Sequence, residues 1–280
     1  MKVLVTGGSG YLGTHVCRFF NADNFSRRVG HDVLDEEDVK VVAEYDAVIH
    51  LAAHLDKDPA AAELCFQTNA SGTANVIKHL RPNAAFIYAS TRDVYGNHPN
   101  TYMTVPETCS TEYTGQSALE WSKLIGERYV EYYAKARGVR ACIFRMSTVY
   151  ARASEGNESV FVTHYVESIK RRAPIHLPLQ GAVIRDILHV EDFCRACEAF
   201  IDSAQPSGLY NLGGGARNSM TLRELVQTIS RLIDIEPHIV EQSALPPNTP
   251  VRYVTDLSRI EEQLGWQPKI GIEEGLRSLF

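Results

Sequence analysis

A glycine-rich turn near the N-terminus constrains the fold of this chain more than any other feature. The apolar run Val3–Val5 stops at the turn, and helical apolar spacing follows it up to Phe20. The pattern G-x-x-G-x-x-G lets the chain turn tightly at Gly7, lets a pyrophosphate approach the backbone at Gly10, and lets the helix pack closely at Gly13. A helix N-terminus also offers free N–H groups to phosphates. A turn that binds nothing is the alternative, but the pattern favours a dinucleotide site made by Gly7, Ser9, Gly10, Tyr11, Leu12 and Gly13.

Strand-like and helix-like segments alternate from residue 3 to about residue 150. Apolar runs at 46–53, 84–91 and 139–146 are separated by helical patterns at 36–44, 59–79 and 119–137. This alternation predicts an α/β fold with a Rossmann-like, doubly wound parallel sheet, in which ligands bind at the carboxyl ends of the strands. We expect residues 1–150 to form the dinucleotide-binding domain and residues 151–280 to form a small C-terminal substrate lobe interleaved with it.

The segment after the first helix is unusually short. Residues 24–35 are too few for a second strand, a crossover helix and a third strand, so the second βαβ unit is predicted to be shortened. The acidic residue that usually binds the ribose has no obvious counterpart. Arg27 and Arg28 lie where the second strand should end. An arginine there favours NADP over NAD, because its guanidinium can bind the 2′-phosphate that only NADP carries. A pair of solvated surface arginines is an alternative of at least equal weight.

Composition excludes several other classes of protein. The net charge of −6 provides no basic surface for nucleic acid, and no apolar run is long enough to span a membrane. Six scattered cysteines and no visible signal peptide predict a reduced, cytoplasmic protein. Cys194 and Cys197 form a C-x-x-C pair, but they lie in a helical pattern without further ligands, so we expect no metal site.

Further motifs appear along nearly the whole chain. They are Thr6–Gly13, His31–Asp35, Asp46–Ala53, Asn69 with Gly72 and Thr73, Ala89–Thr91 with Val94–Gly96, Ser122 and Lys123 with Gly126 and Glu127, Arg185–Val190, and Leu264–Pro268. In this order they resemble the extended short-chain dehydrogenase/reductase family, the nucleotide-sugar epimerases and dehydratases. The resemblance implies transient oxidation of a nucleotide sugar at C4 with NAD or NADP. It also implies a homodimer formed through the helices at 59–79 and 119–137.

The resemblance assigns roles to particular residues. It places the cofactor against Asp32, Val33, Leu51, Ala52, Ala53 and Lys123. It places the substrate against His54, Thr91, Arg185 and Arg252. Within these sets, Thr91 would hydrogen-bond the sugar at C4, Lys123 would hold the nicotinamide ribose, and the two arginines would clamp the diphosphate. His54, at the exit of a strand, is as compatible with simple solvation.

One position departs from the family pattern. The family has a tyrosine as general base four residues before its lysine, and Leu119 occupies that position here. Three hypotheses follow: another group transfers the proton, the protein binds its ligands with little or no turnover, or it performs different chemistry, such as simple NADPH-dependent carbonyl reduction. Asp93 is the first candidate for the missing group, giving a catalytic set of Thr91, Asp93 and Lys123. The other candidates are Tyr113, Glu120 and His54.

Overall fold

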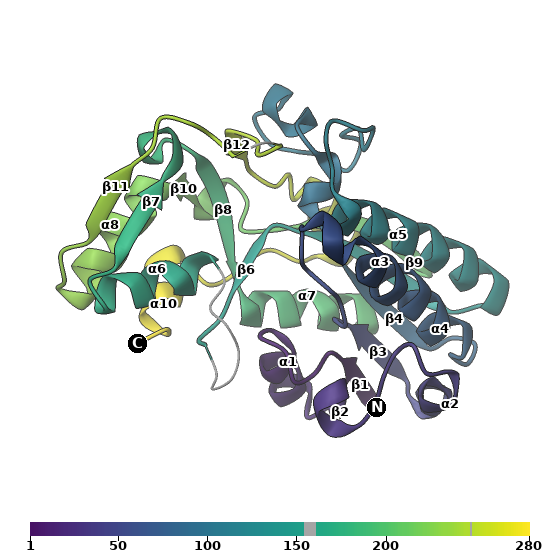
Figure 1. Ribbon diagram of the computed structural model, residues 1–280. Helices are drawn as coiled ribbons and strands as arrows, with labels where there is room; N and C mark the ends of the chain where they lie inside the picture. Colours follow the sequence, from purple (N-terminus) through teal and green to yellow (C-terminus); the bar gives the residue numbers. More distant parts are fainter. Residues whose placement is uncertain (154–160, 247) are drawn as a thin grey trace.

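Six parallel strands form the central sheet, in the order β2-β1-β3-β4-β5-β9 (Figure 1). The computed structural model describes residues 1–153, 161–246 and 248–280. The strands of this sheet are β1 (Val3–Thr6), β2 (Asp23–Phe25), β3 (Ala47–His50), β4 (Ala85–Thr91), β5 (Arg140–Met146) and β9 (Ser207–Leu212). The other strands are β6 (Thr148–Tyr150), β7 (Pro174–Leu177), β8 (Ile184–His189), β10 (Ser219–Thr221), β11 (His238–Glu241) and β12 (Arg252–Tyr253). The helices are α1 (Gly13–Phe20), α2 (Glu36–Val39), α3 (Ala62–Cys65), α4 (Gly72–Lys78), α5 (Ala118–Arg137), α6 (Phe161–Lys170), α7 (Val190–Asp202), α8 (Leu222–Ile233), α9 (Ser258–Leu264) and α10 (Ile272–Arg277).

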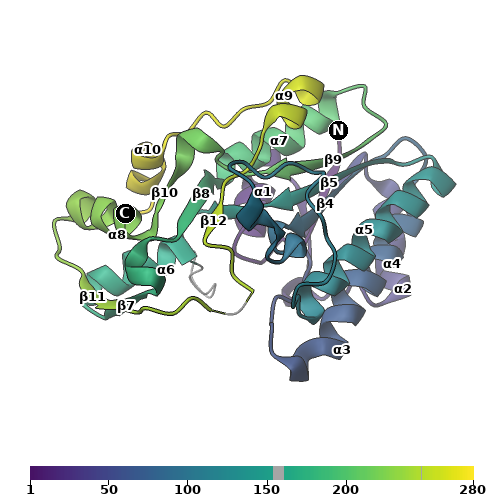
Figure 2. The same cartoon turned by 90° about the horizontal axis from the view of Figure 1, so that it is seen from above.

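Both faces of the central sheet are buried, which explains why its strands appear in the sequence as nearly continuous apolar runs. Val3 and Val5 belong to the core shared with α1 and α7, whereas Leu4 between them belongs to the core shared with α4 and α5. Figure 2 shows α4 and α5 along one face of the sheet and α7 and α9 along the other. The predicted doubly wound α/β fold is confirmed.

The second βαβ unit is shortened, as the spacing predicts. β2 has three residues and is followed by a single 3₁₀ turn, Arg27–Val29, and the next strand, β3, pairs with the other side of β1. The missing crossover leaves the end of β2 and the segment His31–Asp35 beside the glycine turn. Phe25, Ser26 and His31 consequently line the cavity described below.

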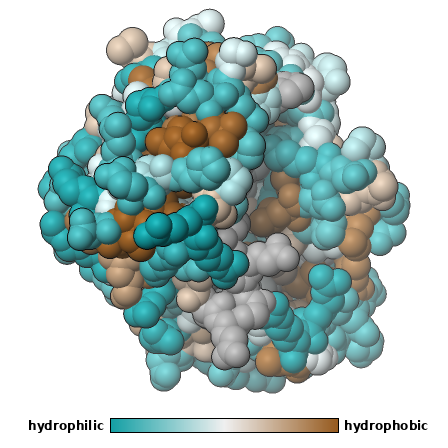
Figure 3. Space-filling model, turned by 60° about the vertical axis from the view of Figure 1, so that its left-hand side comes forward, coloured by the Kyte–Doolittle hydropathy of each residue, from teal (hydrophilic) through white to brown (hydrophobic). Residues whose placement is uncertain are grey.

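Residues after 150 contribute to both parts of the molecule. β9 completes the central sheet and α7 packs against α1. A second sheet, β10-β8-β12 with β6 beside β8, is covered by α6, α8 and α10 and has its own apolar core (Figure 1). On the face drawn in Figure 3, hydrophilic side chains predominate and hydrophobic ones gather in separate groups. No helix in the described ranges is long and apolar enough to cross a membrane.

Two helical predictions need correction. The helix expected over 59–79 is interrupted by a π-helical segment, Phe66–Ser71, between α3 and α4. Asn69 inside it is fully buried and bonds the backbone of His54 in both directions, at 2.8 and 2.9 Å. The helical pattern that begins at Asp256 and ends before Gly265 predicts the last helix of the chain, but the short α10 follows it. The pattern of residues 159–172 also predicts a helix. The structure describes it from Phe161 as α6, and residues 159 and 160 lie outside the described residues.

Candidate active site

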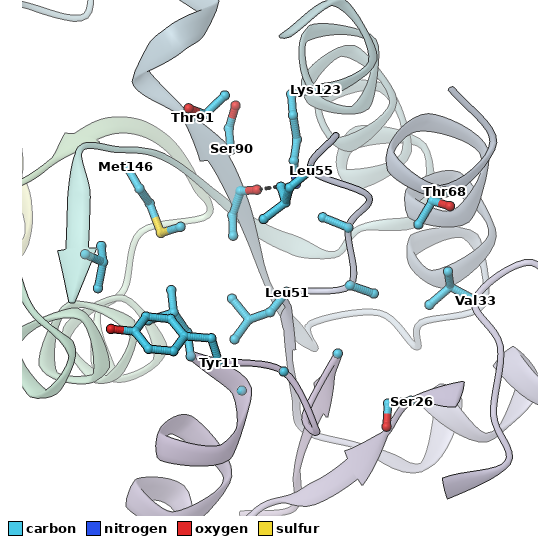
Figure 4. Close-up of a pocket in the computed structure, with 18 of the residues that line it drawn as sticks. Tyr11, Ser26, Val33, Leu51, Leu55, Thr68, Ser90, Thr91, Lys123 and Met146 are labelled. Carbon is cyan, nitrogen blue, oxygen red and sulfur yellow. Dashed lines mark hydrogen bonds between the residues drawn. The ribbon is translucent and has the colours of Figure 1, made fainter. Parts of the chain in front are cut away.

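A cavity of about 730 Å³ lies at the carboxyl ends of β1, β3, β4 and β5, where the parallel sheet is expected to bind ligands. The glycine turn, the end of β2, Leu51–Ala53 and the end of β4 contribute to its wall, together with α5 and Phe161 of α6. Figure 4 shows Tyr11, Leu51, Met146, Thr91 and Lys123 around this space. Its volume is in the range typical of cofactor and small-molecule sites.

Neighbouring backbone lies so close to the glycine turn that Gly7 and Gly13 have no room for a Cβ atom. Gly7 has φ +70°, and a Cβ there would lie 2.8 Å from the backbone nitrogen of Ala52. A Cβ at Gly13 would collide with the carbonyl oxygen of Gly7, whereas a Cβ at Gly10 would meet that oxygen at 3.0 Å and otherwise face open space. The open side of Gly10 lines the cavity ahead of the N-terminus of α1, and this cradle fits a dinucleotide pyrophosphate.

These contacts predict different outcomes for two similar substitutions. We expect Gly13→Ala to lower the free energy of unfolding by about 1–3 kcal/mol, because its methyl group overlaps backbone atoms that cannot move separately. We expect Gly10→Val to keep most of the stability but to weaken cofactor binding, because its side chain fills the cradle. Urea unfolding and calorimetric titration with cofactor measure the two effects. Equal loss of stability in both variants would contradict this assignment.

The remaining residues predicted to hold the cofactor also line the cavity. They are Ser9, Tyr11, Leu12, Arg27, Asp32, Val33, Leu51, Ala52, Ala53 and Lys123. Arg27 and Arg28 are exposed at the rim, where Arg28 also donates to the carbonyl oxygen of Ser9 at 3.2 Å. Their individual contacts with a cofactor are predictions.

Lys123 is buried at the wall of the cavity. It lies on α5, its Nζ donates to the carbonyl oxygen of Ala89 at 2.8 Å (Figure 4), and this ammonium group is 5.0 Å from the centre of the Tyr88 ring. Burial lowers the pKa of Lys123 to about 8, against a smaller opposing effect of Glu127. Lys123 is therefore an amine that can exchange a proton near neutral pH.

Thr91 and Asp93 lie together at the end of β4. The Thr91 hydroxyl accepts the backbone N–H of Asp93 at 3.1 Å and caps the 3₁₀ turn Arg92–Tyr95. The Asp93 carboxylate is held by Lys57 at 2.9 Å and by Arg92 at 3.5 Å. Burial raises the pKa of Asp93, but the charges of Arg92 and Lys57 outweigh burial, and the pKa lies below its ordinary value. Asp93 is thus a stable anion at neutral pH.

Leu119 lines the cavity one helical turn before Lys123. Three of the four residues considered as replacements for the family's tyrosine do not line the cavity. Glu120 is buried and bonded to Ser117 and Lys57. Tyr113 is largely exposed and its ring lies 6.4 Å from that of Trp121. His54 has a buried Nε2 without a hydrogen-bond partner among the described residues, but it is not a lining residue.

The two arginines expected to clamp a diphosphate lie outside the cavity wall. Arg185 is buried and donates through Nη1 and Nη2 to the carbonyl oxygens of Ile184 and Pro250, both at 2.7 Å. Arg252 donates to the carbonyl oxygen of Met103 at 3.0 Å. Burial, with the charge of Arg92 as the next cause, lowers the pKa of Arg185 to about 9. Both side chains hold backbone in this structure, so a diphosphate contact would require them to exchange partners.

Two charged residues at this end of the cavity, Arg92 and Lys57, are not among the site residues predicted from the sequence. Arg92 lines the wall directly after Thr91 and has the same signal, a polar residue at a strand end. Lys57 bridges Asp93 and Glu120, at 2.9 and 2.7 Å, from an exposed loop. No local pattern marks Lys57, because its two partners come from distant segments.

The parallel sheet, the glycine turn and the cavity between them define a dinucleotide-binding protein of the Rossmann class. A sequence profile of the NAD dependent epimerase/dehydratase family matches residues 3–213. The chain belongs to this family.

Buried Cys194 and Cys197 lie on α7, and no group of metal-ligating side chains is found in the described part of the chain.

Two relatives and one solved structure are similar to the chain over nearly its whole length. CDP-paratose 2-epimerase of Salmonella typhi is 26% identical over 340 residues, which cover 100% of this chain and 98% of that one. dTDP-glucose 4,6-dehydratase of Mycobacterium tuberculosis is 27% identical over 313 residues, covering 99% and 92%. The structure of MoeE5 in complex with UDP-glucuronic acid and NAD has a TM-score of 0.85 at 21% identity, covering 99% and 97%. This last likeness shows the shared fold.

Proposed function

We propose that this protein is an NAD(P)-dependent enzyme that oxidises a nucleotide-activated sugar transiently at C4 before a second step, such as epimerisation or elimination. The observation that carries the proposal is a single cavity that joins the glycine turn to Thr91 and Lys123. Relatives named as an epimerase and a dehydratase of nucleotide sugars support it. When bound, the nicotinamide supplies a reversible two-electron acceptor. Residues 151–280 would contribute the substrate lobe.

Lys123 is the group that we place at the proton-transfer step, since Leu119 cannot exchange a proton. A general acid–base group works best when its pKa lies near the working pH, and the pKa of Lys123 is about 8. Neutral Nζ would accept the proton of the sugar hydroxyl, which Thr91 would hold by a hydrogen bond. Asp93, as an anion already paired with Lys57, would act through its charge rather than as the base.

The cofactor preference is proposed to be NADP. The end of β2 has no acidic side chain, and Ser26, Arg27 and Arg28 surround that end of the cavity. We expect the double change Arg27→Ala and Arg28→Ala to weaken NADP binding about tenfold or more and to leave NAD binding nearly unchanged, because only NADP carries the 2′-phosphate. Fluorescence titration with both cofactors measures this. Equal weakening of the two would indicate that the pair does not read the phosphate.

A panel assay tests the proposed function. Purified protein is incubated with NAD or NADP and with UDP-, GDP-, CDP- and dTDP-sugars, and products are separated by chromatography. We expect cofactor-dependent conversion of at least one nucleotide sugar. Protein that binds cofactor but converts none of them would overturn the proposal in favour of a binding protein.

Leu119→Tyr would then be informative, because Leu119 lines the cavity and a phenol there would create activity. Reduction of a small carbonyl compound without any nucleotide-sugar binding would favour a simple reductase.

We also propose a homodimer and a cytoplasmic location. Trp121, Ile125 and Tyr129 recur at every fourth residue of α5, and 37–38% of the surface of each is exposed. A second copy packed on this apolar face would bury them. Sedimentation velocity of the wild type and of Ile125→Glu tests the interface, and a monomeric wild type would contradict it. The six free cysteines fit a reducing compartment.

A further inference from the structure

Arg92 lines the cavity beside Thr91 but has no role in the proposed reaction. It follows Thr91 at the carboxyl end of β4 and lines the cavity together with Thr91 and Lys123. Its side chain is 16% exposed, so it belongs to the wall rather than to the outer surface. The charge of a guanidinium in this place needs a structural or a functional explanation.

The Arg92 guanidinium donates no hydrogen bond to any residue in the described ranges, and its Nη1 is buried without a partner. Its contacts are the face of the Tyr253 ring, 4.8 Å away, and the Asp93 carboxylate, whose nearer oxygen is 3.5 Å from Nε. Two other inward-facing arginines differ sharply. Arg145 donates to Glu127 and Tyr95, and Arg140 donates to four backbone carbonyl oxygens. Buried donors usually have acceptors, so Arg92, which also lines the cavity, is an exception among these three arginines.

The charges around Arg92 favour an anionic ligand. Asp93 is already paired with Lys57, which also pairs with Glu120. Arg185 is close enough for its charge to interact with both Arg92 and Asp93. Arg92 therefore shares its nearest carboxylate, Asp93, with Lys57 and has no anionic partner of its own within hydrogen-bond distance among the described residues. Tyr253, on β12, stacks against the guanidinium and does not line the cavity.

We propose that Arg92 binds a carboxylate on the sugar ring, so that the substrate is a nucleotide-activated uronic acid. The inference rests on the proposed function. A planar guanidinium fork matches a carboxylate, with two parallel hydrogen bonds. Arg92 is the residue next to Thr91, which is placed at the sugar, so the anion that it contacts belongs to the sugar rather than to the diphosphate.

Calorimetric titration of the full-length protein with UDP, UDP-glucose and UDP-glucuronic acid tests this inference, with reduced cofactor present to prevent turnover. The two sugar nucleotides differ at one carbon of the sugar, which is a carboxylate in the second. We expect the wild type to bind UDP-glucuronic acid about 10- to 100-fold more tightly than UDP-glucose. We expect Arg92→Gln to abolish this preference with no change for UDP or UDP-glucose, and Arg92→Lys to retain part of it.

Arg128→Gln is the matched control, because it removes an exposed arginine paired with Glu131 on the outer side of α5. It is expected to leave all three affinities unchanged, and thermal unfolding verifies that each variant is folded. A wild type that prefers UDP-glucose would overturn the inference while leaving the proposed function intact. Equal weakening of all three ligands in Arg92→Gln would also overturn it, since Arg92 would then bind the diphosphate. If none of the three binds, and the GDP, CDP and dTDP counterparts also fail, the proposed function falls as well.

Discussion

Replacing Lys123 by methionine is expected to lower kcat/KM for the nucleotide sugar by about 10²- to 10⁴-fold. Methionine preserves the length and the packing of the side chain against Tyr88, but it cannot exchange a proton. The fold should tolerate the change, because a buried ammonium group that is disfavoured by its surroundings is removed, so we expect Tm to stay constant or to rise. Steady-state kinetics and thermal unfolding measure the two effects.

Lys135→Met provides a control on the same helix. Lys135 is exposed near the end of α5 and does not line the cavity, so its replacement should leave kcat/KM unchanged. If Lys123→Met kept more than about a tenth of the wild-type kcat/KM, Lys123 would not be the proton-transfer group. Asp93→Asn is then the next variant to examine, because Asp93 is the other titratable candidate in the wall.

Glu127→Gln is expected to lower the free energy of unfolding by about 3–5 kcal/mol, the largest effect on stability that we predict. Glu127 and Arg145 form a buried pair with two contacts, at 2.7 and 3.0 Å, and Ser90 donates to the same carboxylate at 2.6 Å. Burial acts to lower the pKa of Arg145, but Glu127 outweighs it and raises the pKa above its ordinary value. The variant would therefore leave a buried guanidinium charge without its counter-ion.

Urea unfolding measures this change, with Glu131→Gln as the control. Glu131 is on the same helix and pairs with Arg128 at the surface, where solvent screens the charges, so we expect a loss of about 0.5 kcal/mol or less. A loss below about 1 kcal/mol in Glu127→Gln would show that the buried pair is replaceable. Because Ser90 lines the cavity, a weakened pair should also reduce activity in a folded variant.

The apolar runs and the glycine spacing predict most strands of the central sheet and the glycine turn, because these features depend on residues that are neighbours in the sequence. The strands of the central sheet are buried on both faces, and the capping box of Thr221 and Glu224 marks the start of α8 directly. The shortened second unit also follows from residue count. The same signals placed the predicted cofactor residues and Thr91 at one edge of the sheet, and the cavity includes them.

Features that depend on distant partners could not be predicted in this way. The π-helical turn around Asn69 is stabilised by hydrogen bonds to His54 and Ser122 from other segments. Lys57 joins two carboxylates that only the folded chain brings together. The sequence motif around Arg185 predicts a diphosphate contact. In the folded chain, however, its guanidinium donates to the backbone carbonyl oxygens of Ile184 and Pro250. The short helix α10 has only six residues, too few for a clear periodic pattern.

The pH dependence of kcat/KM, measured at saturating cofactor with the substrate that the panel assay selects, tests the central claim most directly. Lys123 must lose its proton to act as a base, and its pKa is lowered to about 8. We therefore predict that kcat/KM rises about tenfold for each pH unit below 8 and levels off above it. In Lys123→Met, this rise of kcat/KM with pH should disappear. A wild-type profile that is flat across pH 8, or that falls as the pH rises through 8, would contradict the assignment of proton transfer to Lys123.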